Sequence, residues 1–281
     1  MKLRAGLVQI TSGKDPARNL LRVAQYIRQA ADGGAKFVLT PETTNIISAS
    51  RKQQAAVLRE ESGDETLKAL RTLARELGVT LLIGSLGLKT GEADGRFANR
   101  SFLIGPDGEI RARYDKIHMF DVDLGSGESY RESAAYRPGD KAVLGDAGFA
   151  KIGMTICYDM RFPALFRALA TAGAHILTAP AAFTVPTGRA HWHALLRARA
   201  IENGCFVLAP AQCGTHDDGG DPQRRTYGHS LAISPWGEVL ADGGETEGVT
   251  FVDLDLNDVG AARAKIPSLA HSRVFAPPEG P

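Results

Sequence analysis

The chain has 281 residues, of which 43% are apolar and 23% charged, and its 33 basic and 32 acidic residues give a formal charge of +1. This composition is typical of a globular protein with a sizeable core, and it excludes a disordered or fibrous chain. The near-neutral charge provides no electrostatic basis for binding nucleic acid or an anionic membrane, so we expect neither as a partner.

The first residues, MKLRAGLVQITSGKD, contain an apolar run too short for the core of a signal peptide, and no apolar stretch approaches membrane-spanning length. The three cysteines, Cys157, Cys205 and Cys213, form no C-x-x-C motif and cannot all pair with one another. We therefore expect no disulfide framework and a reducing, cytoplasmic location.

The first third of the chain alternates strand-like apolar runs with helical patterns of apolar residues. Such alternation is typical of βα units. Strands are expected at residues 3–10, 36–42 and 79–88, and helices at 15–34 and 64–78.

Antiparallel hairpins then appear among the βα units. Residues 96–116 contain a Pro-Asp-Gly turn signal, and residues 225–243 repeat the device with Pro-Trp-Gly. Between these hairpins, strands are expected at 150–157, 175–180 and 205–212, and helices at 162–174 and 188–204.

No Ser- or Pro-rich linker and no tandem repeat divides the chain. The mixture of βα units and hairpins therefore predicts one α/β domain over residues 1–270. Residues 271–281 are predicted to form an extended tail with a disordered end, and residues 117–141, rich in Gly, Ser and Asp, a long functional loop.

Cys157 ends an apolar run in the segment KIGMTICYDMRFP. The commoner fate of a single cysteine is burial as a small core residue. Here the thiol lies between a predicted strand and a helix expected to begin near Pro163, where ligands bind in α/β sheets and where backbone N–H groups favour a thiolate. The flanking Asp159 and Arg161 are interpreted as an ion pair or hydrogen-bond anchor that fixes the turn.

Two more charged residues follow predicted strands. Glu42 comes after the apolar run FVLTP, and Lys116 ends the second strand of the first hairpin. Each one alone is compatible with an exposed loop charge. A partly buried carboxylate would instead suit proton transfer, and a fixed lysine would stabilise developing negative charge.

Histidine spacing argues against a catalytic metal. His191 and His193 are two residues apart on a predicted helix, so they lie on different faces, and the other five histidines are scattered. The segment GSGESY lacks the ending of a phosphate-binding loop. We expect neither a metal nor an organic cofactor.

Four motifs occur in order at the predicted strand ends: PETTN at 41–45, RYDKIHMFD at 113–121, YRESAAYRPGD at 130–140 and CYDMRFP at 157–163. Together they resemble the nitrilase, or carbon–nitrogen hydrolase, superfamily over nearly the whole chain. The resemblance implies an α-β-β-α sandwich, in which two mixed sheets pack face to face with helices outside. It also implies a homodimer or larger homo-oligomer and an activity that needs no cofactor.

The resemblance also implies a catalytic set, formed by Glu42, Lys116, Cys157 and Glu132. Cys157 would be the nucleophile, Glu42 the acid and base, and Lys116 an oxyanion partner together with the backbone N–H of Tyr158. The fourth member would orient the lysine or the substrate amide. Glu128 competes with Glu132 for that place, and the RES context favours Glu132.

Residues 182–216 and 227–238 resemble the amidase branch that acts on ω-amides of small dicarboxylates, and AQCGTH resembles its deaminated-glutathione amidase type. This implies a cysteine-dependent amidase that works through a thioester. A nitrilase or an N-carbamoyl amino acid amidohydrolase would use the same residues, and a catalytically silent binding or scaffold protein is the alternative of another class. The sequence departs from the branch at PETTNIIS and at the insert HDDGGDPQRR, which we expect beside the pocket.

An ω-amide of a dicarboxylic acid needs a cation to bind its far carboxylate. The candidates are Arg161 and the arginine-rich predicted helix that contains Arg189, with Phe183 as a further substrate-binding residue. That helix has an apolar stripe as well as arginines, which equally suits a subunit interface.

Overall fold

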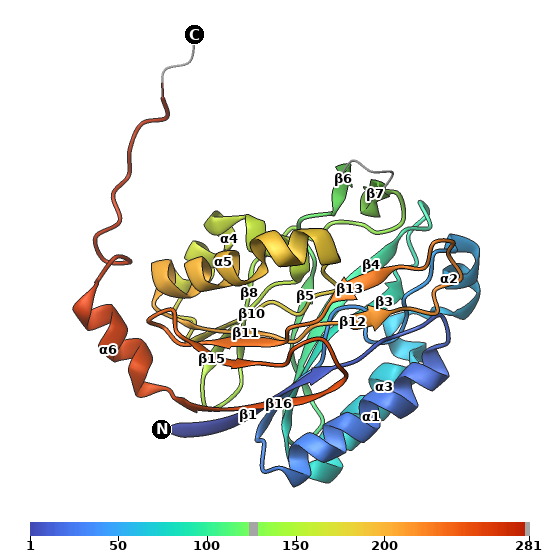
Figure 1. Ribbon diagram of the computed structural model, residues 1–281, viewed down its shortest axis with the longest axis horizontal. Coiled ribbons are helices and arrows are strands. Elements are labelled where there is room, and N and C mark those ends of the chain that lie inside the picture. The colour runs from blue at the N-terminus through green and yellow to red at the C-terminus, as the bar shows by residue number, and fades with distance from the viewer. Residues whose placement is uncertain (124–128, 279–281) are drawn as a thin grey trace.

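The computed structural model describes residues 1–123 and 129–278, and two six-stranded mixed sheets packed face to face form its centre (Figure 1). In the first sheet three parallel strands are flanked by antiparallel ones. Its order is β16 (Gly248–Asp255), β1 (Lys2–Gln9), β2 (Phe37–Leu39), β3 (Thr80–Lys89), β4 (Phe97–Ile104) and β5 (Ile110–Asp115).

The second sheet repeats this plan, with three parallel strands between antiparallel neighbours. Its order is β15 (Val239–Asp242), β14 (Leu231–Ile233), β11 (Phe206–Ala209), β10 (Ile176–Thr178), β9 (Lys151–Met154) and β8 (Val143–Asp146). Most of these strands are short continuous apolar runs because both of their faces are covered.

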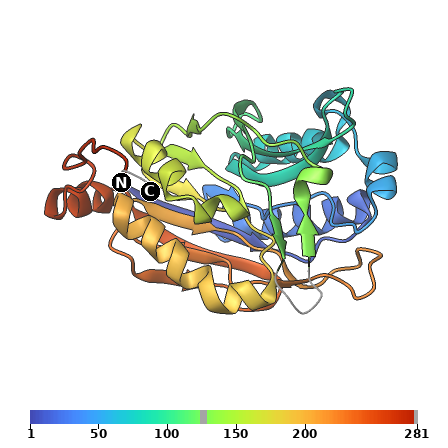
Figure 2. The same ribbon diagram turned by 90° about the horizontal axis from the view of Figure 1, so that it is seen from above.

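Helices cover the outer face of each sheet, which makes the four layers visible in Figure 1 and, from above, in Figure 2. The first sheet is covered by α1 (Pro16–Asp32) and α3 (Glu65–Leu77), and the second by α4 (Pro163–Thr171) and α5 (Val185–Asn203). The α-β-β-α sandwich predicted from the sequence is confirmed. None of the described helices is both long and apolar enough to cross a membrane.

The ends of the outer helices follow from local sequence. The Asp15 carboxylate accepts hydrogen bonds from the N–H groups of Ala17 and Arg18 at the start of α1, and Asp64 caps α3 in the same way through Leu67. At the end of α3, Gly78 adopts a left-handed conformation with φ of 61°, which a residue without Cβ adopts at little cost.

Two apolar cores hold the layers together. The larger one lies between the sheets and beneath α4 and α5, and the fully buried Phe37, Ile176 and Trp192 belong to it. The smaller one lies between the first sheet and its helices, where Ile27 of α1 packs with Leu70 of α3. Each sheet is therefore fixed on both faces, which gives the strand ends defined positions.

Smaller elements surround this sandwich. They are α2 (Arg51–Val57), α6 (Asn257–Lys265), the hairpins β6 (Asp121–Asp123) with β7 (Ser129–Arg131) and β12 (Cys213–Thr215) with β13 (Arg225–Tyr227), and the 3₁₀ helices η1 (Glu61–Gly63), η2 (Glu132–Ala134) and η3 (Cys157–Arg161). Beyond α6, residues 273–278 have no regular structure and project from the body (Figure 1). Residues 279–281, at the end of the tail predicted for 271–281, lie outside the described residues, and the domain boundary at residue 270 stays a prediction.

Three expectations need correction. Residues 117–141 are not one loop, because β6 pairs with β7 there and η2 follows. The helix expected at 188–204 begins at Val185, with a proline in its first turn where its missing N–H costs nothing. The strand at 225–227 pairs with β12, so the hairpin around Pro235 consists of β14 and β15 alone.

Candidate active site

A pocket of about 790 Å³ opens where the ends of strands from both sheets meet. Glu42 reaches it from the loop after β2, Lys116 from the end of β5 and Cys157 from the turn after β9. Glu132 comes from η2, and all four side chains line the same cavity. The competing Glu128 lies outside the described residues.

Lys116 lies between two carboxylates. Its Nζ donates to Glu42 Oε1 at 2.9 Å and to both oxygens of Glu132 at 2.9 and 2.8 Å. The side chains of Lys116 and Glu42 are only 2% and 5% exposed, so this is a buried charge cluster and not a surface ion pair. Removing three charges from water costs desolvation free energy, which their mutual attraction need not fully offset. A buried cluster of this kind therefore argues for a role beyond stability.

The charges in the cluster determine its protonation. Burial raises the pKa of Glu42, but the adjacent Lys116 ammonium outweighs it and holds that pKa below its usual value. Burial lowers the pKa of Lys116, while Glu132 and Glu42 together raise it well above its usual value. Glu42 is therefore an ionised carboxylate beside a protonated lysine, and it can accept a proton.

Cys157 is a thiol in the resting protein, because burial and the nearby Glu42 charge raise its pKa well above the usual value. Its backbone adopts φ of 49°, which is strained for a residue with a side chain, and its N–H donates to Pro180 O at 2.9 Å. This turn presents the thiol to the pocket at the start of η3.

Asp159 anchors that turn to the strand that carries Lys116. Its Oδ2 accepts hydrogen bonds from the Ile156 N–H at 2.8 Å and the Tyr114 hydroxyl at 2.7 Å. Its Oδ1 accepts from the His118 N–H at 3.0 Å and lies 2.7 Å from the His118 ring nitrogen. Asp159 is fully buried, and it has the anchoring geometry expected from the sequence.

Hydrogen bonds also hold the loop that carries Glu42. The Glu42 carboxylate accepts a hydrogen bond from the Ala182 N–H at 2.9 Å, and the Glu42 backbone carbonyl accepts one from Gln212 Nε2 at 2.9 Å. Gly84 of β3 permits the loop to approach, because a Cβ there would lie 2.0 Å from the Thr40 carbonyl oxygen.

One buried side chain that sequence analysis missed also joins the cluster. Asn99 of β4 donates through Nδ2 to Glu42 Oε1 at 3.0 Å and to Glu132 Oε1 at 3.3 Å. Its Oδ1 is buried without a hydrogen-bond partner among the described residues. An asparagine in the middle of a predicted strand carries no sequence signal of such a role.

The Tyr158 N–H lies directly after the nucleophile candidate, and Tyr158 lines the pocket. Outside η3 itself, no backbone acceptor of this N–H is found in residues 1–123 and 129–278. Its place next to Cys157 is the one expected from the sequence for an oxyanion donor.

The predicted substrate-binding residues have different positions. Phe183 lines the pocket, while the Arg161 guanidinium lies over the rings of Phe183 and Tyr158, at 5.4 and 5.9 Å, without lining the cavity itself. Arg189 is exposed on α5 and is not brought to the pocket. Arg224, from the insert that sequence analysis placed beside the pocket, does line it.

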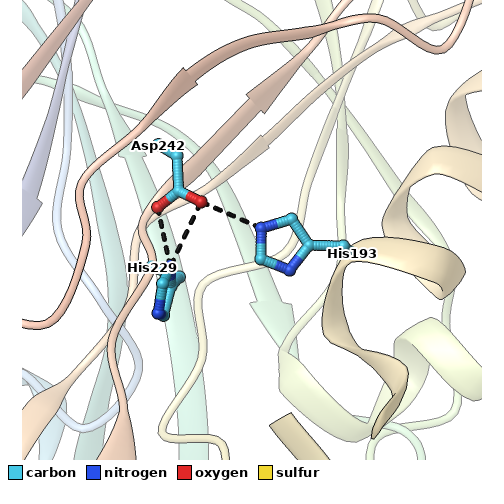
Figure 3. A group of neighbouring side chains, drawn as sticks. All are labelled: His193, His229 and Asp242. Carbon is cyan, nitrogen blue, oxygen red and sulfur yellow. Dashed lines mark hydrogen bonds and ion pairs between the residues drawn. The ribbon is translucent and has the colours of Figure 1, made fainter. Parts of the chain in front are cut away.

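Elsewhere, His193, His229 and Asp242 come together outside the pocket (Figure 3). Their ligand atoms lie close enough to hold a metal ion. In this structure the Asp242 carboxylate lies 2.9 Å from a ring nitrogen of each histidine, which joins α5 to the β14–β15 hairpin. The histidine that shares this carboxylate with His193 is therefore His229, which is distant in sequence, and not His191.

A profile of the carbon–nitrogen hydrolase family matches residues 4–264. The chain is 40% identical over 271 residues to a deaminated glutathione amidase of Yersinia enterocolitica, covering 95% of this chain and 92% of that protein. Among solved structures it resembles the Caenorhabditis elegans NitFhit protein, with a TM-score of 0.88 and 34% identity over 97% of this chain and 65% of that one. It also resembles a variant amidase of Nesterenkonia whose active-site cysteine has added acrylamide, with a TM-score of 0.76 and 27% identity over 94% of this chain and 98% of that one.

Proposed function

The chain belongs to the carbon–nitrogen hydrolase family and is a hydrolase of carbon–nitrogen bonds other than peptide bonds, and we propose that it hydrolyses deaminated glutathione or a similar carboxylate-bearing ω-amide. The names of its relatives support the substrate class. The observation that supports the chemistry best is the buried ionic cluster of Glu42, Lys116 and Glu132 beside the Cys157 thiol.

In the first half-reaction, Cys157 Sγ attacks the amide carbon while its proton passes to Glu42. Because the pKa of the thiol is raised and that of Glu42 is lowered, proton transfer accompanies carbon–sulfur bond formation and does not precede it. The oxyanion receives hydrogen bonds from Lys116 Nζ and the Tyr158 N–H. Glu42 then gives the proton to the departing nitrogen, the carbon–nitrogen bond breaks, and a thioester remains.

In the second half-reaction, Glu42 takes a proton from water as the water oxygen attacks the thioester carbon. The same two donors stabilise the second oxyanion. The carbon–sulfur bond breaks and the proton returns to the sulfur, which regenerates the thiol and releases the acid. Glu132 holds the lysine throughout, because both of its oxygens accept from Nζ and Oε2 also accepts from the Phe120 N–H at 2.7 Å.

We further propose a homodimer. Large apolar side chains are exposed on α5 and the adjacent β14–β15 hairpin, where Ile201, Trp236 and Val239 are 52%, 51% and 44% exposed. A second copy of the chain would cover this face. A cytoplasmic location is supported by the three buried cysteines, none of which forms a disulfide in the described part of the chain.

The test is acid and ammonia or amine release from matched ω-amides, nitriles and N-carbamoyl amino acids. We expect the ω-amides to give the highest kcat/KM, and a burst of labelled acyl-enzyme on rapid quenching. A protein that cleaves nitriles faster than amides would contradict the proposal. No turnover on any of the three classes would favour a silent binding protein.

A further inference from the structure

Arg224 supplies a positive charge that the proposed chemistry leaves unused. It lies just before β13 and lines the pocket together with Glu42 and Cys157. Lys116 is neutralised by two carboxylates, whereas no described carboxylate forms an ion pair with Arg224. From Arg224, the nearby Asp218 carboxylate accepts the backbone N–H, at 3.2 Å, and not the guanidinium.

The Arg224 guanidinium is held in place by one hydrogen bond, but not all of its N–H groups have an acceptor. Its Nη2 donates to the Ala182 carbonyl at 2.8 Å, and its Cζ lies 5.8 Å from the centre of the Tyr130 ring. Its Nε is buried and has no acceptor within residues 1–123 and 129–278. A buried N–H without a partner costs free energy that a ligand oxygen would restore.

This position is directly connected to the reacting groups. Ala182 accepts from Arg224 through its carbonyl and donates through its N–H to Glu42 Oε2 at 2.9 Å. A single residue therefore separates the arginine from the acid–base carboxylate. The Arg224 charge is also near enough to contribute to holding the pKa of Glu42 low, after the larger effect of Lys116.

Other cations around the pocket are differently placed. Arg51, Arg131 and Arg225 also line the pocket but are exposed, and the first two donate to main-chain carbonyls. Arg161 lies behind the two rings that face the cavity, with its Nη2 3.3 Å from a ring nitrogen of His191. Arg224 is thus the half-buried cation that is directed at the pocket.

We propose that Arg224 forms a carboxylate-binding subsite and selects amides that carry a negative charge. A planar guanidinium with a free N–H matches the two oxygens of a carboxylate. This inference rests on the proposed amidase function. The carboxylate can belong to the acyl part of the substrate or to its amine part, and the experiment separates these two sources.

The kinetic test uses two matched pairs of substrates. Glutaramate and pentanamide differ by a carboxylate on the acyl side, and N-butanoylglycine and N-butanoylglycinamide differ by one on the amine side. Arg224→Gln should raise KM at least tenfold for the charged member of one pair and less than twofold for its neutral member. The pair that responds identifies the source of the carboxylate.

Two further variants make the test specific. Arg224→Lys keeps the charge without the planar fork, so it should recover part of the lost affinity and shows that the site tolerates a change of side chain. Arg18→Gln removes an exposed cation from α1 and controls for net charge. Equal losses on charged and neutral amides, or no change on either pair, would overturn the subsite.

A binding measurement keeps the subsite testable if the amidase proposal fails. Calorimetry with glutarate on Cys157→Ala requires no turnover. Binding that weakens at least tenfold when Arg224→Gln is added supports the subsite, even for a protein that hydrolyses none of these amides. Equal glutarate binding with and without Arg224, or none to Cys157→Ala, would refute it.

Discussion

The stability of the protein should fall steeply in mild acid because of His216. This side chain is fully buried between two polar groups, with Nδ1 2.7 Å from the Ser12 carbonyl oxygen and Nε2 2.8 Å from Thr226 Oγ1. Burial, reinforced by the Arg224 charge, lowers the pKa of His216 from 6.5 to about 4. Ser12 in turn binds Gln212, which supports the Glu42 loop, so the histidine belongs to the scaffold of the pocket.

Proton uptake by the unfolded chain determines the direction in which stability changes with pH. Between pH 6.5 and about 4 the unfolded chain binds a proton at this histidine while the folded protein does not, so stability falls as the pH falls. At about 1.4 kcal/mol per pH unit, this site alone should remove about 3 kcal/mol of unfolding free energy between pH 7.5 and 4.0.

The assay is urea unfolding at 25 °C over that pH range for the wild type and for His216→Asn. The variant should be less stable at pH 7.5, because two hydrogen bonds are altered. Its loss of unfolding free energy between pH 7.5 and 4.0 should, however, be about 3 kcal/mol smaller than that of the wild type. His271→Asn, which removes an exposed histidine, is the control. Parallel curves for the wild type and His216→Asn would refute the reasoning.

The remaining predictions concern the candidate catalytic set. Cys157→Ala should abolish turnover while changing the unfolding free energy by about 1 kcal/mol or less. In the wild type, incorporation of iodoacetamide should parallel inactivation. Residual turnover in the variant would exclude the thioester route. Lys116→Met should slow turnover by about 10²–10³-fold. It should also lower the unfolding free energy by about 3–5 kcal/mol near pH 8, because Glu42 and Glu132 lose their counter-ion. This loss of stability should be smaller at pH 5, where a carboxylate can bind a proton. A change in KM alone would make Lys116 a binding residue. Asp159→Asn should lower kcat with little effect on KM and cost about 1–3 kcal/mol of stability, since the Cys157 turn loses a charged acceptor; unchanged kcat would show that the anchor is dispensable.

The sandwich and the set of Glu42, Lys116, Glu132 and Cys157 were predicted through the family resemblance that four sequence motifs carry. The strands themselves are readable because they are continuous apolar runs bounded by turn residues. The β6–β7 hairpin was missed, because its strands have three residues each, which is too few for an alternating pattern to be recognised.

The contacts within the site could not be read from the sequence. The pairing of Lys116 with two carboxylates depends on bringing β5, η2 and the loop after β2 to one point. Asn99 and Arg224 are ordinary polar residues in a strand and an insert until the fold places them beside Glu42. Such residues become visible only when burial and partners are known.

The pairing of β1 with β16 has a consequence for how the chain acquires its structure. Eight residues at one end of the chain, Lys2 to Gln9, pair in antiparallel register with eight near the other end, Gly248 to Asp255. The first sheet is thus incomplete until β16 has left the ribosome, and during synthesis the open edge of β1 needs protection from other strands. Contacts between such distant segments also slow folding. A chain shortened before β16 should therefore aggregate, although every candidate catalytic residue lies upstream of the cut.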